Sequence, residues 1–258
     1  MKRRSFAKLT SAGTIGLMLP SFSRENKTTH ILTLSFDDGF KKSFTKTAKI
    51  FENYGLKACL NVMASGHFSD ITPPSNYVAP GTLGNFELWN RLAERGHEIM
   101  PHGWNHTNLT KVPFKQATEL IDKSLEYFQQ NLSGFELEKA VFNFPFNASN
   151  NELENYVLHK ARALRTIENG PLNSFPSDKS ARLGCDSRGP ENADNWLEQQ
   201  VTDFLKSIGG WLILNLHGLD GEGWGPISSE YLDKLLKQIT KHKFLEILPA
   251  GFAINKYG

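Results

Sequence analysis

The chain has 258 residues, which is long for one domain but within the range of a single α/β barrel. Its formal net charge of +2 comes from the first 23 residues, where Lys2, Arg3, Arg4 and Lys8 occur without any acid, so the remainder holds 25 basic against 27 acidic residues. This near-neutral balance argues against a nucleic-acid-binding protein.

Residues 1–23 have the composition of an export signal. Basic residues precede a short apolar stretch from about residue 12 to residue 19, and the small residues Ser21 and Ser23 follow it. The pair Arg3 and Arg4 resembles the twin-arginine type of signal. The apolar stretch is shorter than the roughly 20 residues that a spanning helix needs. We therefore predict a cleaved signal and a periplasmic or extracellular protein without a stable membrane span; a basic leader or a short membrane anchor is the alternative.

From residue 30 to residue 258, short apolar runs alternate with amphipathic segments. The segments 41–55, 86–96 and 194–209 repeat apolar residues at the helical period, and each ends in a glycine where a C-terminal cap is expected. This alternation predicts an α/β fold in which crossover helices connect parallel strands, and the length favours a closed or nearly closed barrel. The candidate strands are residues 31–36, 57–63, 97–101, 139–144, 162–167, 180–184, 211–216 and 244–248.

Two features between these elements allow more than one interpretation. The loop 69–85 is rich in proline and glycine and could shape a substrate groove, although a plain surface loop is the simpler interpretation. Cys59, in "KACLNVM", is typical of a small core residue, and the sequence does not decide whether it forms a disulfide with Cys185.

Adjacent carboxylates, Asp37 and Asp38, follow the first strand in "LSFDDGF". Neighbouring like charges raise the cost of ionising each other, so an incidental pair is unexpected at this position. Successive side chains of a strand point to opposite faces, so both carboxylates can serve one site only if the backbone turns, which Gly39 permits. Loops at the C-terminal ends of barrel strands build the active site, which makes the pair a candidate, although Asp-Gly is also common turn chemistry.

Histidines follow two later strands. His102 and His106 occur in "EIMPHGWNHTNL", and if Pro101 opens a helical turn, both imidazoles lie on one face and can bind one metal ion. One carboxylate and two imidazoles leave positions open for water and substrate. His217 ends the strand in "WLILNLHGL" and is a candidate general acid or base; a strand-end imidazole with a hydrogen-bond partner is the alternative.

The order of "SFDDG", "HGWNH" and "LNLH" resembles the polysaccharide deacetylases of the NodB type, carbohydrate esterase family 4, whose motifs run TFDDG, H-[ST]-x-x-H and L-x-x-H. The resemblance extends from about Ile31 to the C-terminus and includes "RLAERGHEI" before the histidine pair. It implies a distorted (β/α) barrel and an enzyme that removes N- or O-acetyl groups from a carbohydrate, with an acetylated glycan as substrate and no required protein partner.

The resemblance also implies residue roles. Asp38, His102 and His106 would bind a divalent metal ion, commonly zinc, with cobalt or another ion possible. Asp37 would be the base that takes a proton from the metal-bound water. His217 would be the acid that protonates the departing amine or alcohol. This assignment explains the adjacent carboxylates, because a metal ion on Asp38 offsets their repulsion.

The third motif of the family carries an arginine that orients the catalytic base, and here it reads "NFPF" with Asn143 at that position. The family's oxyanion donor, a backbone N–H, would map onto Phe146 after Pro145. Loss of the arginine should raise the pKa of Asp37 and loosen its position. Arg182 or Arg188 could compensate from another loop, and a solvated or structural role for either is the alternative.

Tryptophans supply the remaining candidates. Trp104, between the two histidines, and Trp224, in "DGEGWGP", could contact the sugar, and either could equally be a packing residue. The family's fourth motif, an Asp followed shortly by Trp, is not clearly present. Asp194 and Trp196 are nearby, but Trp196 fits the apolar face of its helix.

Two rival functions follow from these observations. A non-catalytic carbohydrate-binding relative would explain Asn143, but binding alone needs neither Asp37 nor His217. A non-haem Fe(II) oxygenase also uses two His and one carboxylate. Those sites generally occur on all-β folds with the carboxylate close to the first histidine, whereas Asp38 is separated from His102 by a long stretch that contains a helix.

Overall fold

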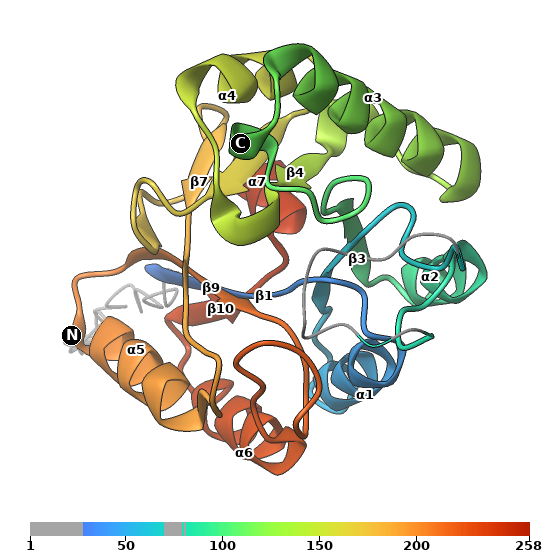
Figure 1. Cartoon of the computed structure of the whole chain (residues 1–258). Coiled ribbons are helices and arrows are strands. Elements are labelled where there is room, and N and C mark those ends of the chain that lie inside the picture. The colour runs from blue at the N-terminus through green and yellow to red at the C-terminus, as the bar shows by residue number, and fades with distance from the viewer. Residues whose placement is uncertain (1–27, 70–78, 80) are drawn as a thin grey trace, which may run out of the picture.

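The computed structural model describes residues 28–69, 79 and 81–258 (Figure 1). The predicted export signal and most of the predicted loop at 69–85 lie outside these residues. Among the helices that are described, none is both long and apolar enough to cross a membrane.

Parallel strands form the centre of the molecule (Figure 1). The larger sheet has the order β3-β2-β1-β9-β6, with β10 also paired to β1 and β8 to β9, and the smaller sheet has the order β4-β5-β7. Only the pairing of β6 with β9 is antiparallel among the described ladders. The strands are β1 (His30–Phe36), β2 (Cys59–Val62), β3 (Glu98–Pro101), β4 (Val141–Asn143), β5 (Ala163–Thr166), β6 (Leu172–Asn173), β7 (Arg182–Gly184), β8 (Asp186–Ser187), β9 (Gly210–Leu216) and β10 (Leu245–Ile247).

Helices cover the outside of both sheets (Figure 1). An apolar core that includes Phe44, Trp89, Leu197 and Leu235 packs α1, α2, α5 and α6 against the larger sheet. A second core packs α3 and α4 against the smaller sheet. Asparagine or serine side chains cap α2, α4 and α6 at their N-termini. The helices are α1 (Lys41–Glu52), α2 (Phe86–Glu94), α3 (Phe114–Asn131), α4 (Asn151–Leu158), α5 (Asp194–Lys206), α6 (Ser229–Ile239) and α7 (Ala250–Tyr257), with 3-10 turns at Leu109–Lys111, Leu137–Lys139 and Pro145–Asn147.

Strand β1 fixes the position of the first motif. Strand β9 pairs with it over its whole length, while β10 and β2 share the other edge, β10 at His30–Leu32 and β2 at Ser35–Phe36. The ladder continues one residue past β1, because the Asp37 N–H donates to Leu216 O at 2.8 Å. The aspartate pair therefore begins on the most extensively paired strand of the sheet.

The inward faces of both sheets enclose a third core. It contains Cys59, Val141, Ala163 and Ile213, and α7 contributes residues such as Ile254 to it. Because side chains alternate along a strand, the residue two positions further on each of these strands also faces inward. Those positions are Asn61, Asn143, Arg165 and Asn215, all buried, and they form a polar layer above the apolar one.

Side chains complete the ring of strands where the backbone ladder is interrupted. The Asn143 Nδ2 donates to Pro101 O at 3.3 Å, and the His102 Nδ1 donates to Asn143 O at 3.0 Å, so β3 and β4 are linked across the gap between the sheets. The predicted α/β fold with parallel strands and crossover helices is confirmed, and the barrel is distorted by this interruption.

All eight predicted strands are present, and so are the three helices predicted from periodicity. Gly55, Gly96 and Gly209, which follow those helices, all have positive φ. The two-residue strands β6 and β8 were not predicted. Cys59 and Cys185 are buried free thiols, so the disulfide that the sequence left open is not formed.

Candidate active site

The aspartate pair turns at Asp38. This residue has φ 79° and Gly39 has φ 92°, so the chain leaves the strand direction directly after Asp37. A non-glycine residue with positive φ is uncommon and marks a position that the surrounding structure holds in place. The turn sends Asp37 into the polar layer and Asp38 toward the two histidines, so the predicted use of both carboxylates at one site is possible.

The helical turn predicted after Pro101 is wrong. Pro101 is the last residue of β3, and the chain continues as a bend in which Gly103 has φ 73° and His106 has φ 59°. The bend is held to the loop after β2, because Ala64 N–H donates to Gly103 O at 3.0 Å. Both imidazoles nevertheless face Asp38, with the His102 Nε2 at 3.5 Å and the His106 Nε2 at 3.3 Å from Asp38 Oδ1.

This set of donors fits a divalent cation. One ligand atom from each of Asp38, His102 and His106 lies within 4.8 Å of the others, and all three residues are buried. The His102 Nδ1–H donates to Asn143 O, which leaves its Nε2 lone pair directed at Asp38. Asp38 Oδ1 is buried without a hydrogen-bond partner in the described part of the chain. A carboxylate and two neutral imidazoles with an unsatisfied buried oxygen are a typical zinc-type ligand set.

Charges within the site oppose the effect of burial on two of these residues. Burial alone raises the pKa of Asp38, but the neighbouring His106 and His102 outweigh it and leave that pKa lowered. Burial lowers the pKa of His106 to about 4, even though the charge of Asp38 opposes this shift. In the absence of a bound cation, Asp38 is therefore ionised and His106 is neutral at pH 7, as metal ligands must be.

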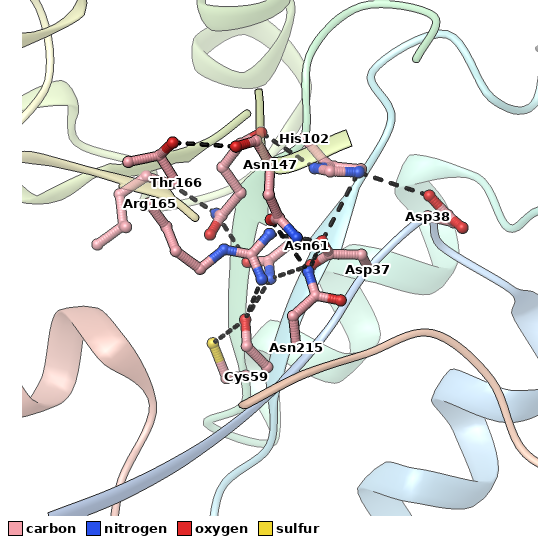
Figure 2. A network of polar contacts seen from close by, with 12 residues as sticks. Asp37, Asp38, Cys59, Asn61, His102, Asn147, Arg165, Thr166 and Asn215 are labelled. Atoms are coloured by element: carbon pink, nitrogen blue, oxygen red, sulfur yellow. Dashed lines mark hydrogen bonds and ion pairs between the residues drawn. The ribbon is translucent and has the colours of Figure 1, made fainter. Parts of the chain in front are cut away.

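Both oxygens of Asp37 are held by amide or guanidinium donors (Figure 2). The Asn61 Nδ2 donates to Oδ1 at 2.7 Å, and the Arg165 Nη2 contacts Oδ2 at 2.5 Å. Asn215 Nδ2 also donates to Oδ2. Burial raises the pKa of Asp37, but the charges of Arg165, His102 and His217 outweigh it, so the pKa is lowered and the carboxylate is ionised.

Arg165 was missed by the sequence interpretation. Its side chain is 0% exposed, and Asp37 is its ion-pair partner. The hypothesis that Arg182 supplies this cation is wrong, because Arg182 pairs with Glu154 at 2.8 Å on the outside of β7. Arg188 is exposed, as the alternative of a solvated residue predicted. The cation beside Asp37 therefore comes from a strand, β5, rather than from a loop.

The loop after β4 contains Pro145 and Phe146, the residues of the predicted oxyanion donor. Phe146 has φ 60° and follows Pro145, and none of the backbone hydrogen bonds of this loop uses its N–H. The ring of Phe146 is 48% exposed and lies 4.4 Å from the ring of His106, measured between centroids. The side chain of the residue that carries the predicted oxyanion donor therefore packs against a predicted metal ligand.

His217 directly follows the last residue of β9. Trp224 packs edge-on against its imidazole, with centroids 5.4 Å apart and an interplanar angle of 81°. Burial lowers the pKa of His217, although the charges of Asp38 and Asp37 oppose the shift. Its Nδ1 has no hydrogen-bond partner among the described residues. Trp224 is therefore placed at the site, next to the predicted acid.

The other tryptophans that the sequence indicated pack inside the protein. Trp104 is 8% exposed and lies among aromatic residues, with the Lys123 Nζ 4.0 Å above its ring. This burial favours the packing role over contact with a sugar. Trp196 packs against the main apolar core, as its helical position indicated, and Asp194 accepts a hydrogen bond from Ser228 N–H.

Comparisons with known proteins concern the family and the fold. The family model described as polysaccharide deacetylase matches residues 24–162. No curated protein matches the sequence. The structure resembles the Xyl-CE4 domain of a multidomain xylanase from the hindgut metagenome of Trinervitermes trinervoides, with a TM-score of 0.56 and 16% identity over 89% of this chain and 91% of that one.

Two further solved structures are similar. The peptidoglycan deacetylase PdaC from Bacillus subtilis has a TM-score of 0.54 and 15% identity over 88% of this chain and 92% of that one. A family 4 pseudoenzyme from Bacillus anthracis has a TM-score of 0.56 and 11% identity over 90% of this chain and 67% of that one. At these identities the likeness shows a shared fold, and both active and inactive proteins have it.

Proposed function

The chain belongs to the polysaccharide deacetylase family, and on that premise we propose that it is a metal-dependent hydrolase that removes N- or O-acetyl groups from a carbohydrate. The observation that carries the proposal is the buried cluster of Asp38, His102 and His106 directly beside a separately held carboxylate, Asp37. Binding of a glycan alone would need neither the cluster nor the second carboxylate.

The proposed metal ligands are Asp38, His102 and His106. A divalent ion bound there, most simply Zn²⁺ and otherwise Co²⁺ or a similar ion, would supply Lewis acidity to a water molecule and to the acetyl carbonyl. Asn143 O accepts from His102 and keeps its Nε2 available as a ligand. Asp38 supplies the negative charge in the cluster, since both histidines can bind in their neutral form.

In this proposal, different residues of the chain carry out the individual proton transfers. Asp37 takes a proton from the attacking water, whose oxygen forms a bond to the acetyl carbon. The unpaired N–H of Phe146 donates to the oxygen that becomes negative. When the carbon–nitrogen or carbon–oxygen bond breaks, His217 would give a proton to the departing amine or alcohol, which requires its protonated form, favoured by the charges of Asp38 and Asp37 and opposed by the effect of burial on its pKa. Asp37 keeps the proton taken from the water, and acetate is the second product.

Aromatic side chains flank the proposed reaction centre. Phe146 lies on the side of His106, and Trp224 on the side of His217, where its ring is half-buried. Aromatic faces pack well against the apolar faces of sugar rings. The proposed substrate is accordingly an acetylated sugar bound between them. One of the similar structures is a domain of a xylanase and another is a peptidoglycan deacetylase. Acetylated xylan and peptidoglycan are therefore both included as test substrates.

We also propose that the protein is exported and that residues 30–258 are the catalytic domain. The basic residues and short apolar stretch of residues 1–23 support this proposal. A glycan substrate outside the cytoplasm is consistent with it.

Acetate release tests the proposed function. The mature protein, loaded with zinc or cobalt, is incubated with chitooligosaccharides, peptidoglycan fragments and acetylated xylan, with Asp37→Asn and His217→Asn as controls. Acetate release by the wild-type protein that is lost in both variants supports the deacetylase function, and the substrate that gives it identifies the substrate class. No release from any substrate, with metal bound at the cluster, would favour the non-catalytic carbohydrate-binding relative.

A further inference from the structure

The loop between β9 and α6, residues 217–228, carries two residues of the candidate site. His217 is its first residue, and Trp224 packs against the imidazole. The backbone of this loop is irregular, and four of its residues have positive φ: Asp220, Gly221, Gly223 and Gly225. A glycine-rich segment has many accessible conformations. Contacts with another element are therefore needed to hold His217 in one position.

Helix α1 provides such contacts through Ser43, which is 2% exposed. The carboxylate of Glu222 accepts from the Ser43 hydroxyl at 2.5 Å and from the Ser43 N–H at 3.1 Å, both at Oε2. The Ser43 Oγ in turn accepts from the Leu219 N–H at 2.9 Å. Hydrogen bonds to a carboxylate are stronger than those between neutral groups. Two residues of the loop are thus tied to one buried serine of α1.

The Glu222 carboxylate also caps the N-terminus of α1. Phe40 is the N-cap residue of this helix and makes no side-chain cap hydrogen bond. The N–H of Ser43, the third helical residue, belongs to the first turn, where backbone donors lack partners within the helix. The first turn of α1 contains no acidic residue of its own, and a negative charge is favourable there. The helix and the loop therefore stabilise each other through Glu222.

Gly223, the next residue, connects this contact to the candidate acid. A Cβ added to Gly223 would lie 2.8 Å from Phe40 Cε2 and 3.3 Å from His217 Cβ, so the backbone here packs closely against both side chains. Phe40 is 0% exposed and follows Asp38 by two residues. The position of Glu222 therefore influences where His217 lies relative to the segment that carries Asp38.

We propose that Glu222 is a positioning residue for the catalytic acid: its contact with Ser43 holds the loop 217–228 so that His217 can reach the leaving group. The inference rests on the proposed function, in which His217 is that acid. Glu222 acts through the loop backbone and takes no part in a proton transfer. A leaving group that departs as a stable anion needs little help from an acid. The proposal therefore predicts that the effect of losing Glu222 depends on the leaving group.

Two substrates with different leaving groups test this dependence. One is the glycan from which the wild type releases acetate, and the other is 4-nitrophenyl acetate, whose phenolate leaves without protonation. The variants are Glu222→Ala, Glu222→Gln, Ser43→Ala and the double alanine variant, with Lys46→Met as the matched control. Lys46 joins α1 to the same loop through Asp220 at 2.6 Å, but the two side chains are 52% and 45% exposed. An ion pair this exposed contributes little.

We expect Glu222→Ala to lower kcat on the glycan by about tenfold or more, as part of the roughly 100-fold or more that a positioned acid supplies, and to leave kcat on 4-nitrophenyl acetate within about twofold. Glu222→Gln retains an oxygen that can accept from Ser43 and should keep most of the glycan activity. The double alanine variant should be no slower than the slower single variant, because both substitutions remove the same contact. Lys46→Met should match the wild type on both substrates.

Hydrogen exchange of the metal-free proteins gives a readout that needs no activity. Amides of residues 217–228 should exchange about tenfold faster in Glu222→Ala than in the wild type or Lys46→Met. If the wild type deacetylates a glycan but Glu222→Ala keeps full activity, or loses both activities equally, the positioning role is overturned while the proposed function stands. If the wild type releases no acetate from any glycan, the proposed function fails, and the exchange rates decide whether Glu222 holds the loop; unchanged rates overturn that as well.

Discussion

The buried ion pair between Asp37 and Arg165 makes Asp37→Asn a change of stability as well as of catalysis. Both side chains are at most 1% exposed, and their closest atoms are 2.5 Å apart. The substitution removes the negative charge and leaves the guanidinium buried without a counter-charge. Removing one partner of a buried pair costs about 3–5 kcal/mol. The substitution keeps one oxygen, which can accept from Asn61 or from Asn215 but not from both, because these amides donate to different oxygens of Asp37. We therefore expect at least the lower end, about 3 kcal/mol.

Thermal and urea unfolding measure this cost, with a chelator present so that no metal ion contributes. For a domain of this size, about 3 kcal/mol corresponds to a fall in Tm of about 6–12 °C. The double variant Asp37→Asn, Arg165→Gln removes both charges of this ion pair and should recover most of the loss. Glu154→Gln is the matched control: its partner Arg182 is 41% exposed and can return to water, so we expect a loss of about 1 kcal/mol or less.

Two results would refute this reasoning. If Asp37→Asn unfolds within about 1 kcal/mol of the wild type, the guanidinium does not depend on the carboxylate as the burial of both implies. If the double variant is no more stable than Asp37→Asn, the loss has another cause than the unpaired charge. The same experiment decides how activity data are read, because acetate release by Asp37→Asn must be normalised to the folded fraction.

Three further predictions follow from other parts of the structure. Burial raises the pKa of Glu98 from 4.5 to about 7. Between these pH values the folded state therefore binds more protons than the unfolded state. The free energy of unfolding should fall by about 3 kcal/mol as the pH rises through this window. Glu98→Gln should abolish that fall in urea titrations at pH 5 and pH 8, and an unchanged pH dependence would contradict the assignment. His106→Ala should remove the rise in Tm that zinc gives the wild-type protein, and a rise of equal size in both would exclude this histidine as a ligand. Gly103 has φ 73°, and the Cβ of Gly103→Ala would lie 2.9 Å from Pro145 Cγ, so this substitution should lower the free energy of unfolding by about 1–3 kcal/mol. Gly134→Ala is the control, because Gly134 has a similar φ but no atom within 4 Å of the added Cβ, and it should cost less. Equal losses of stability would mean that backbone strain, and not the contact with Pro145, causes the loss.

The order of the strands and the identity of the motif residues could be predicted because both depend on local patterns. Apolar runs between amphipathic segments gave all eight longer strands, and parallel strands bring their C-terminal ends to one edge, which predicts that Asp38 and His102 meet. The two-residue strands β6 and β8 carry too few residues to show alternation, so no sequence pattern indicated them.

The conformation of the histidine loop could not be predicted from spacing. Two histidines four residues apart suit a helical turn, but the backbone contacts between this loop and the loop after β2 favour a bend instead. Those contacts join residues about 40 positions apart in the sequence, and local propensity contains no information about them. His106, two residues after this pairing, has a positive φ that no local pattern predicts.

Arg165 was missed for a different reason, and one signal for it does exist. It lies 128 residues from Asp37, so spacing says nothing about their contact. In "ALRT", however, Ala163 faces the barrel interior, and the period of two places Arg165 on the same face. A charged residue that points into a barrel from a central strand needs a partner of opposite charge. The aspartate pair, at the C-terminal end of β1, is the candidate.

A second arginine beside Asp37 would change the net charge of the site. Asp37, Asp38 and Arg165 together sum to one net negative charge, and the charges of Asp37 and Asp38 raise the pKa of His102 against the effect of burial. A net negative charge attracts a divalent cation. A second arginine at position 143 would bring that sum to zero and place a cation beside His102, whose Nδ1 donates to the carbonyl of the same residue. Metal affinity should therefore fall in Asn143→Arg and recover when Arg165→Asn is added.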